Sequence, residues 1–347
     1  MKKKKIIFIG AIDMGNVATN GETMKNQLLL RRFEDIYDEV IAVDANNWRK
    51  RPWCFVQILW SLIWNGNVPV VISASSASSK LYDFLYYFPL KQNVNDWVIG
   101  GAFPKKIREG EYRLQSLAKL NRIIVEGESM AIELREMGLS NVVHVPNFKP
   151  IEFTPNISVK KEGEKYRFVF LSRIHPNKGI QEIVEACKEL NLTGYNNQYE
   201  IDFYGAFEKG YEPTFHQLTS AYENMHYKGF LNLMDTKGYQ ILSQYDSMLF
   251  PSYWNGEGFP GIVIDAYIAG LPIIASDWNM NKEVIEDGKT GFIIPTHDAH
   301  SLALKMKELI DGQADLYQMR CHCAERAQYY DYRNVVTEDL LKNLNLL

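Results

Sequence analysis

Two cationic side chains five residues apart could hold an anionic ligand. Arg173 and Lys178 follow the apolar run 167–171, and Gly179 precedes a stretch with helical spacing. Arginine offers a planar fork of N–H donors and lysine a compact point charge, so the two can converge on an anion at the carboxyl end of a strand. Taken alone, such residues are more often solvated loop charges, and the motifs that follow shift the balance toward a binding site.

A glycine-rich turn after the apolar run 248–250 indicates a second part of the same site. We expect a helix to begin near Pro260, because proline suits a first helical turn. The N–H groups of such a helix start can bind a phosphate, and the helix dipole alone favours it by ~0.3–2 kcal/mol. Glu257 lies just before this helix and Asp265 inside it, where carboxylates can accept hydrogen bonds from sugar hydroxyls. For Glu257, a favourable position beside the helix dipole is the structural alternative.

The strands and helices that must position these residues are predicted in two series. Short apolar runs recur, with helix-length amphipathic stretches between most of them. They are residues 6–9, 40–43, 68–72, 97–99, 122–125 and 142–145, then 167–171, 201–204, 248–250, 273–275 and 292–294. Continuous apolar strands that alternate with helices are typical of parallel sheets buried on both faces. The sequence therefore predicts an α/β protein with two doubly wound Rossmann-like domains, whose ligands bind beyond the carboxyl ends of the strands.

The chain length and one proline-rich segment predict the domain boundaries. The length of 347 residues suits two domains, and the two prolines of segment 146–150 interrupt regular structure. We predict an N-terminal domain over 1–150 and a C-terminal domain over 151–323. A helical segment over 324–347 is expected to pack back toward the N-terminal domain.

Composition narrows the class of protein and its partners. Four cysteines in 347 residues imply no disulfide framework and favour a reducing compartment. The lysine-rich start leads into an apolar run of only four residues, which predicts a first strand and not a signal peptide. Residues 1–150 hold 20 basic and 15 acidic side chains, whereas the remainder has a net charge of −9. The basic half favours anionic partners, but its charges are spread too thinly for nucleic acid.

The segment 48–64 has two interpretations. Arg49, Lys50 and Arg51 precede a stretch from Cys54 to Trp64 in which only Gln57 and Ser61 are polar. Those 11 residues would span about 16 Å as a helix, which is too short to cross a bilayer. The stretch is either a core helix between two strands or an interfacial helix with tryptophans at head-group level.

The second half of the chain resembles the donor domain of the retaining glycosyltransferase family 4, which has the GT-B fold. In that fold two Rossmann-like domains face a central cleft. The resemblance follows the order of the family's motifs from about residue 167 to residue 309. The matching segments are Leu171-Ser172-Arg173, Asn177-Lys178-Gly179, the E-x7-E segment from Glu257 to Ala266, Gly270 to Ser276 and Asp287 to Phe292. Shorter matches are Val145-Pro146-Asn147, Tyr204-Gly205 and Lys228-Gly229-Phe230.

The resemblance implies a role for each matched residue. Arg173 and Lys178 would neutralise the donor diphosphate, Glu257 would contact the donor sugar, and Asp265 would hold the ribose hydroxyls. The remaining donor contacts implied are the backbone of Gly258, Phe259 and Pro260 at the sugar and β-phosphate, and Gly205, Gly229 and Phe230 at the nucleobase. Asp265 departs from the family, which usually has glutamate there, and its side chain is one methylene shorter.

The resemblance also implies the reaction. It predicts metal-independent transfer of a sugar, with retention and without a cofactor, from a nucleotide-sugar to a saccharide or lipid-linked saccharide. Such a step belongs to surface polysaccharide or glycoconjugate synthesis. Uracil is the expected base, while guanine and adenine stay open. We expect a cytoplasmic enzyme in peripheral contact with the anionic inner face of the membrane.

The loop after the first strand is the expected acceptor side of the site. Residues 11–23 include Gly15 and Gly21, which lack a Cβ and so allow a ligand to approach the backbone closely. Asp13 and Glu22 in this loop are the candidate polar contacts.

Two other functions are weighed against this one. Gly256, Gly258 and Gly261 formally satisfy G-x-G-x-x-G, with Asp277 about 20 residues on, which is the pattern of a NAD-dependent dehydrogenase. However, three residues separate the strand from that motif and Pro260 interrupts it. A sugar-nucleotide-binding module without turnover is the second alternative, and slow hydrolysis of a nucleotide-sugar would distinguish an enzyme from it.

Overall fold

The chain forms two compact units. The computed structural model describes residues 3–16, 21–46, 51, 53–74 and 78–347. One unit comprises residues 1–150 together with 330–347, and the other comprises residues 151–329. The boundary predicted after residue 323 falls inside α13 (Leu316–Tyr329), so the chain returns to the first unit only at residue 330. Helix α13 continues past 323 because Met319, Cys323 and Ala327 form one buried face.

Within the described residues, the first unit contains a six-stranded parallel sheet in the order β2-β1-β3-β4-β5-β6. Its strands are β1 (Lys5–Gly10), β2 (Glu39–Asp44), β3 (Val70–Ser73), β4 (Val94–Trp97), β5 (Arg122–Val125) and β6 (Val142–His144). Strand β4 begins three residues before the predicted run 97–99 and overlaps it only at Trp97. The polar residues Asn95 and Asp96 are buried inside this strand. Because of them, most of the strand does not appear as an apolar run in the sequence.

Helices cover this first sheet, and some of them come from the end of the chain. They are α1 (Gly21–Ile36), α2 (Trp53–Trp64), α3 (Ser78–Tyr87), α4 (Phe103–Arg108), α5 (Leu114–Leu117), α6 (Glu128–Glu136), α14 (Tyr332–Val335) and α15 (Glu338–Asn343). Leu341 and Leu344 lie in the same apolar core as Phe8 and Phe33. The C-terminal segment therefore completes the core that β1 and α1 begin.

The second unit has a parallel sheet of the same size, in the order β12-β11-β10-β7-β8-β9 among the residues described. Its strands are β7 (Tyr166–Leu171), β8 (Tyr199–Tyr204), β9 (Met225–Gly229), β10 (Ser247–Phe250), β11 (Ile273–Ser276) and β12 (Gly291–Ile294). Strand β9 was missing from the predicted runs because His226, Tyr227 and Lys228 are not fully buried, as befits a strand at the sheet edge.

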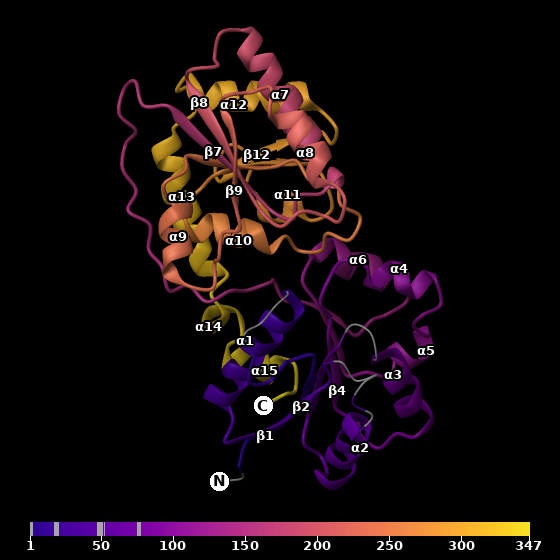
Figure 1. The fold of residues 1–347 in the computed structure, drawn as a ribbon. Helices are drawn as coiled ribbons and strands as arrows, with labels where there is room; N and C mark the ends of the chain where they lie inside the picture. The colour runs from indigo at the N-terminus through magenta and orange to yellow at the C-terminus, as the bar shows by residue number, and fades with distance from the viewer. Residues whose placement is uncertain (1–2, 17–20, 47–50, 52, 75–77) are drawn as a thin grey trace. The chain divides into compact units, whose positions relative to one another are not determined.

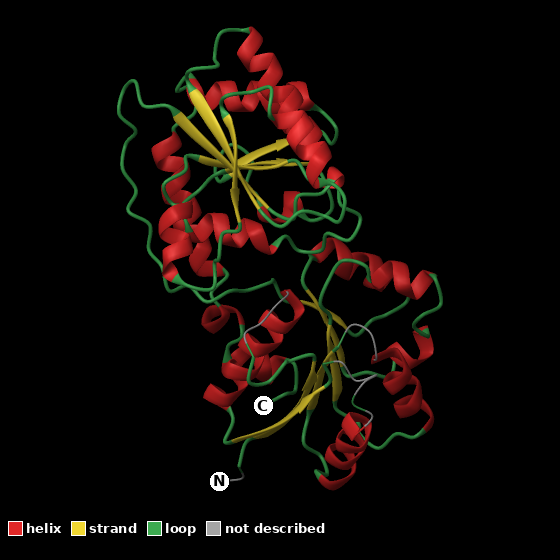
Figure 2. Cartoon of the chain, in the orientation of Figure 1, coloured by secondary structure: helices red, strands yellow, loops and turns green. Residues whose placement is uncertain are grey.

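Helices cover both faces of the second sheet, as Figures 1 and 2 show. They are α7 (Ile180–Leu192), α8 (Glu212–Thr219), α9 (Thr236–Leu242), α10 (Gly261–Ile268), α11 (Asn281–Val284), α12 (Ala299–Ile310) and α13, together with the 3-10 turn η2 (Pro176–Lys178). The strand order reverses between β7 and β10, because the chain continues from β7 to β8 on one side and returns to β10 on the other. Doubly wound sheets bind their ligands at such a reversal, beyond the carboxyl ends of the strands.

Helix α2 has features of both a core helix and an interfacial helix, the two interpretations of the segment 48–64. It buries Cys54, Ile58 and Leu62 but leaves Trp53, Trp60 and other apolar side chains exposed. The preceding Trp48, Arg49 and Lys50 lie outside the described residues. Over the ranges that the structure describes, none of the helices has both the length and the hydropathy needed to cross a bilayer.

Candidate active site

Lys178 and Glu257 meet where the strand order of the second sheet reverses. Lys178 follows β7 and Glu257 follows β10, and the ammonium Nζ forms an ion pair with the carboxylate oxygen Oε2. The side chains are only 11% and 17% exposed, so water screens the pair little. Ser252 donates a second hydrogen bond to the same oxygen at 3.2 Å. The fold thus places a cation and a carboxylate together at the position expected for an anionic sugar ligand.

The turn that carries Lys178 is held close to the strand end of β10. His175 caps η2 by accepting a hydrogen bond from the Asn177 N–H at its Nδ1, 3.0 Å away. Gly179 adopts φ +81°, and a Cβ there would lie 2.3 Å from the carbonyl oxygen of Pro251. Only glycine allows this approach, because a Cβ would clash with Pro251 and the left-handed backbone disfavours other residues.

The turn after β10 is fixed by residues that sequence reasoning missed. The indole N–H of Trp278 donates to the carbonyl of Trp254 at 2.9 Å, and the side-chain amide of Asn279 donates to the carbonyl of Glu257, also at 2.9 Å. Both donors come from the loop after β11, the next strand of the sheet. The backbone on either side of the turn therefore has fixed partners, which limits the positions open to Glu257.

The start of α10 has no side-chain cap near this turn. Helix α10 begins at Gly261, and Pro260 before it provides no side-chain acceptor to the first helical turn. Gly258 and Phe259 are half-buried. The prediction of a helix that begins near Pro260 is confirmed, and its N-terminus adds positive potential beside Lys178 and Glu257.

Asp265 lies inside the protein. It is 4% exposed and accepts a hydrogen bond from the hydroxyl of Tyr239 at 2.7 Å. Burial, and then the carboxylate of Asp265, raise the pKa of Tyr239, so its hydroxyl stays protonated and acts as the donor. The sequence offered no structural partner for this carboxylate, whereas the fold provides one on α9. Its contact with a ribose stays a prediction.

Arg173 makes its ion pair away from Lys178. Its guanidinium Nη1 lies 3.3 Å from the carboxylate of Glu208, and its side chain is 64% exposed. Exposure lets this long side chain move without disturbing the core. The structure therefore brings Lys178 and Glu257 together but gives Arg173 a different carboxylate partner.

The expected nucleobase residues lie at the carboxyl ends of β8 and β9. Gly205 has φ +147°, and a Cβ there would lie 1.7 Å from the carbonyl oxygen of Ser172. The N–H of Gly205 donates to the carbonyl of Gly229 at 2.8 Å, so these strand ends are in contact. Phe230 is 77% exposed and presents an aromatic face that could stack on a base.

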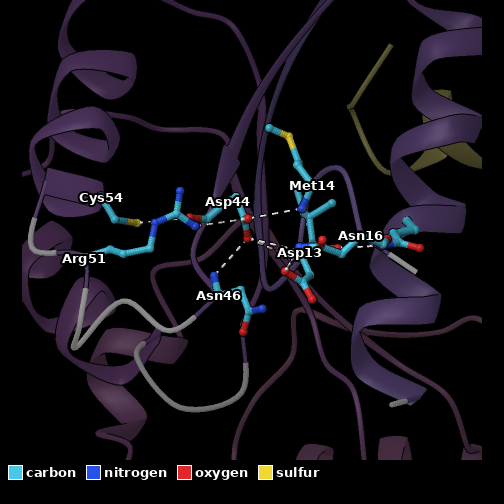
Figure 3. Close-up of polar contacts among 9 residues, drawn as sticks. Asp13, Met14, Asn16, Asp44, Asn46, Arg51 and Cys54 are labelled. Carbon is cyan, nitrogen blue, oxygen red and sulfur yellow. Dashed lines mark hydrogen bonds and ion pairs between the residues drawn. The ribbon is translucent and has the colours of Figure 1, made fainter. Parts of the chain in front are cut away.

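In the first unit, Asp44 at the end of β2 holds the loop after β1. Its carboxylate accepts hydrogen bonds from the N–H groups of Ile12, Asp13 and Met14 at 3.1 to 3.2 Å, and from Asn46 at 2.9 Å. Burial raises the pKa of Asp44, but these backbone donors outweigh burial and the net pKa lies below its ordinary value. Figure 3 shows this carboxylate between the loop and Arg51. Sequence reasoning missed Asp44.

The loop itself has the backbone shape of a tight turn. Asp13 has φ +55° and accepts a hydrogen bond from the side chain of Asn16 at 3.0 Å (Figure 3). Gly15 has φ +85°, and a Cβ on it would have no neighbour within 4 Å. Gly21 and Glu22 begin α1, while 17–20 lie outside the described residues. The role of Asp13, Gly15, Gly21 and Glu22 in acceptor binding stays a prediction.

Among the residues described, no three histidine, cysteine, aspartate or glutamate side chains gather as a metal ion would require. The polar groups of the described site are the Lys178–Glu257 pair, Arg173 nearby in the sequence and the backbone at the start of α10.

Comparison with known proteins identifies relatives. Residues 152–329 match the family model described as glycosyl transferases group 1. The putative colanic acid biosynthesis glycosyltransferase WcaL of Salmonella typhimurium is 27% identical over 155 residues, which cover 44% of this chain and 37% of that protein. The poly(ribitol-phosphate) alpha-N-acetylglucosaminyltransferase of Staphylococcus aureus is 23% identical over 312 residues, which cover 87% of this chain and 56% of that protein. The matched regions thus span less than two thirds of either relative.

A solved structure matches nearly the whole chain. The structure of Anabaena HepE in complex with UDP has a TM-score of 0.72 at 12% identity, and covers 99% of this chain and 100% of that one. At this identity the likeness shows the fold alone. Together with the two doubly wound sheets, the structural matches confirm the predicted GT-B fold.

Proposed function

Because the chain belongs to the family of glycosyl transferases group 1, we propose that it is a metal-independent, retaining glycosyltransferase. It moves a sugar from a nucleotide-sugar to a saccharide or lipid-linked saccharide during synthesis of a surface polysaccharide. Membership of this family argues against the alternative of a NAD-dependent dehydrogenase that uses Gly256, Gly258 and Gly261.

The observation that carries the proposal is the Lys178–Glu257 pair at the point where the strand order reverses. An incoming diphosphate would compete with Glu257 for the ammonium of Lys178. Once the diphosphate holds Lys178, the Glu257 carboxylate becomes available to accept hydrogen bonds from the hydroxyls of the donor sugar. One ion pair therefore supplies both a phosphate-binding cation and a sugar-binding carboxylate.

The chemistry follows from where negative charge develops. The acceptor oxygen bonds to the anomeric carbon on the face from which the diphosphate leaves, and the bond from that carbon to the phosphate oxygen breaks. The proton of the acceptor hydroxyl passes to the departing phosphate. Lys178, Arg173 and the N-terminus of α10 would stabilise the growing charge on the phosphate, and preorganised groups of this kind supply the largest part of many rate enhancements.

The relatives support the choice of substrates. HepE is solved with UDP, and we propose a UDP-sugar donor here. The Staphylococcus relative is named for transfer to poly(ribitol-phosphate), an anionic polymer. The basic residues 1–150 of this chain suit an anionic or lipid-linked acceptor in the same way. We place the reaction in the cytoplasm, at the inner face of the membrane.

A panel of nucleotide-sugars tests the proposal by thermal shift and by release of free nucleotide. A donor at 100 times its Kd should raise the free energy of unfolding by ~2.7 kcal/mol. We expect UDP-sugars to stabilise the protein and one of them to be hydrolysed slowly in the absence of acceptor. Stabilisation without any hydrolysis would instead identify a binding module, and the absence of stabilisation by every donor would refute the assignment.

A further inference from the structure

Helix α2 has an outward face that is as apolar as its inward face. Cys54, Ile58, Ser61 and Leu62 are buried, whereas the positions between them are exposed. The exposed side chains are Trp53, Phe55, Val56, Gln57, Trp60, Ile63 and Trp64. Six of these seven are apolar, and Trp53, Trp60 and Trp64 are 77%, 62% and 67% exposed. A surface helix of a globular protein normally has polar residues on its outward face, so this apolar face indicates a binding surface.

The apolar surface continues onto α3 through a row of aromatic rings. The rings of Phe55 and Phe84 have centroids 6.4 Å apart, and those of Phe84 and Phe88 are 5.2 Å apart. Tyr87 and Phe88, at the end of α3, are each 58% exposed. We call the exposed side chains of α2 together with Tyr87 and Phe88 the α2–α3 face.

Two properties of the α2–α3 face indicate what kind of surface it would bind. Residues 53–74 include no charged side chain, and the only acid on α2 or α3 is Asp83, which accepts a hydrogen bond from Ser116. Two basic side chains also lie near this face. Lys80 is exposed on α3, and Arg113 donates to the hydroxyl of Tyr87 at 2.7 Å with its guanidinium 5.5 Å from the ring centroid. Tryptophan and tyrosine around an apolar surface, with basic side chains at the rim, match the interface of an anionic bilayer.

We propose that the α2–α3 face docks on the surface of an anionic lipid bilayer. At 12 residues, α2 is about 18 Å long, so it lies in the plane of the interface and does not cross the bilayer. Its outward side chains enter the boundary between head groups and acyl chains, while Lys80 and Arg113 meet lipid phosphates. The inference extends the proposed function, because a lipid-linked acceptor would be presented at the same surface.

Charge favours a bilayer over a second copy of the chain. In a two-fold interface the same patch packs on itself, which would bring the basic rims of two copies together. Like charges across an interface oppose association, whereas anionic lipids neutralise the same side chains. Insertion of the apolar side chains therefore provides the strength of docking. Anionic lipids neutralise the basic side chains of Lys80 and Arg113.

The test is co-sedimentation with phosphatidylcholine vesicles, prepared with and without phosphatidylglycerol. The variant carries Trp60→Gln and Trp64→Gln, two exposed positions where substitution leaves the core intact, and its thermal unfolding should match the parent. We expect the parent to bind the anionic vesicles and the variant to bind roughly tenfold more weakly or worse. Leu192→Gln is the matched control, because Leu192 is 78% exposed but lies on α7 in the other unit. It should bind as the parent does.

Three results would overturn the inference. They are no binding of the parent to anionic vesicles, equal binding by the double variant, and a concentration-dependent dimer that the double variant abolishes in sedimentation velocity. Stabilisation by UDP separates this inference from the proposed function. The double variant should keep that stabilisation, and Lys178→Ala should bind vesicles like the parent.

Discussion

Lys178 and Glu257 are 79 residues apart in the chain, yet they form an ion pair at the carboxyl ends of the neighbouring strands β7 and β10. Neither strand alone could create this pair, because it depends on the return of the chain from β9 to the far side of β7. The pair is the centre of the proposed donor site.

The first prediction concerns Lys178. Replacing it by alanine removes the cation proposed to stabilise the departing phosphate, so turnover should fall ~100- to 1000-fold while the fold persists. Turnover is measured as release of free nucleotide, and folding as the midpoint of thermal unfolding. Lys165→Ala is the control, because Lys165 forms an exposed ion pair with Glu200 at the opposite end of β7. Unchanged turnover in Lys178→Ala would refute the assigned role.

The second prediction compares two glycines with the same backbone conformation. Gly179 and Gly194 have φ of +81° and +89°, but a Cβ clashes with Pro251 only at Gly179. Gly194→Ala should cost about 1–2 kcal/mol of stability from the left-handed backbone. Gly179→Ala adds the clash, so it should cost more and also displace Lys178. Urea unfolding measures both variants, and equal losses would show that the close approach to Pro251 contributes nothing.

The third prediction concerns the partner of Asp265. Tyr239→Phe removes the donor to this buried carboxylate and should lower the free energy of unfolding by about 1–3 kcal/mol. If Asp265 also binds ribose, stabilisation by UDP should change as well. Tyr317→Phe on α13, at a ring that is 39% exposed, should change neither quantity. A stability of Tyr239→Phe equal to that of the parent would contradict the hydrogen bond.

The fourth prediction is a pH dependence from Asp96, which is buried in β4. Burial raises the pKa of Asp96 to about 7, above its ordinary value of 3.8. Between these values the unfolded chain loses the proton first, so stability falls as pH rises from about 4 to about 7 and is constant beyond. Asp96→Asn cannot ionise, and its stability relative to the parent should rise over this window by at most ~4 kcal/mol. Urea unfolding at several pH values measures the difference, and a difference independent of pH would argue against the raised pKa.

Much of the fold was predictable because parallel strands are marked by short apolar runs. The run 122–125 coincides with β5, and 248–250 lies within β10. The misplaced β4 and the missing β9 show the limit of this signal. A strand that buries Asn95 and Asp96, or one that lies at the sheet edge with Tyr227 and Lys228 partly exposed, no longer looks apolar.

The candidate site was predictable only where one short segment carries the signal. Lys178 and Glu257 each stand in a recognisable strand, turn and helix, so both could be named from the sequence. Asp44, Tyr239 and Trp278 could not, because each acts through hydrogen bonds to a segment that only the folded chain brings near. Hydropathy and turn composition have no means of indicating such pairs.

Residues 151–329 are inserted between two stretches that build one core. Leu341 and Leu344 pack with Phe8 and Phe33, and Tyr37 donates a hydrogen bond to the carbonyl of Leu346 at 2.8 Å. As the nascent chain leaves the ribosome, the first sheet must therefore wait for residues more than 300 positions downstream of β1 before its core is closed. The inserted unit ends at residue 329, so all of its elements are synthesised before the C-terminal residues that close the core of the first unit.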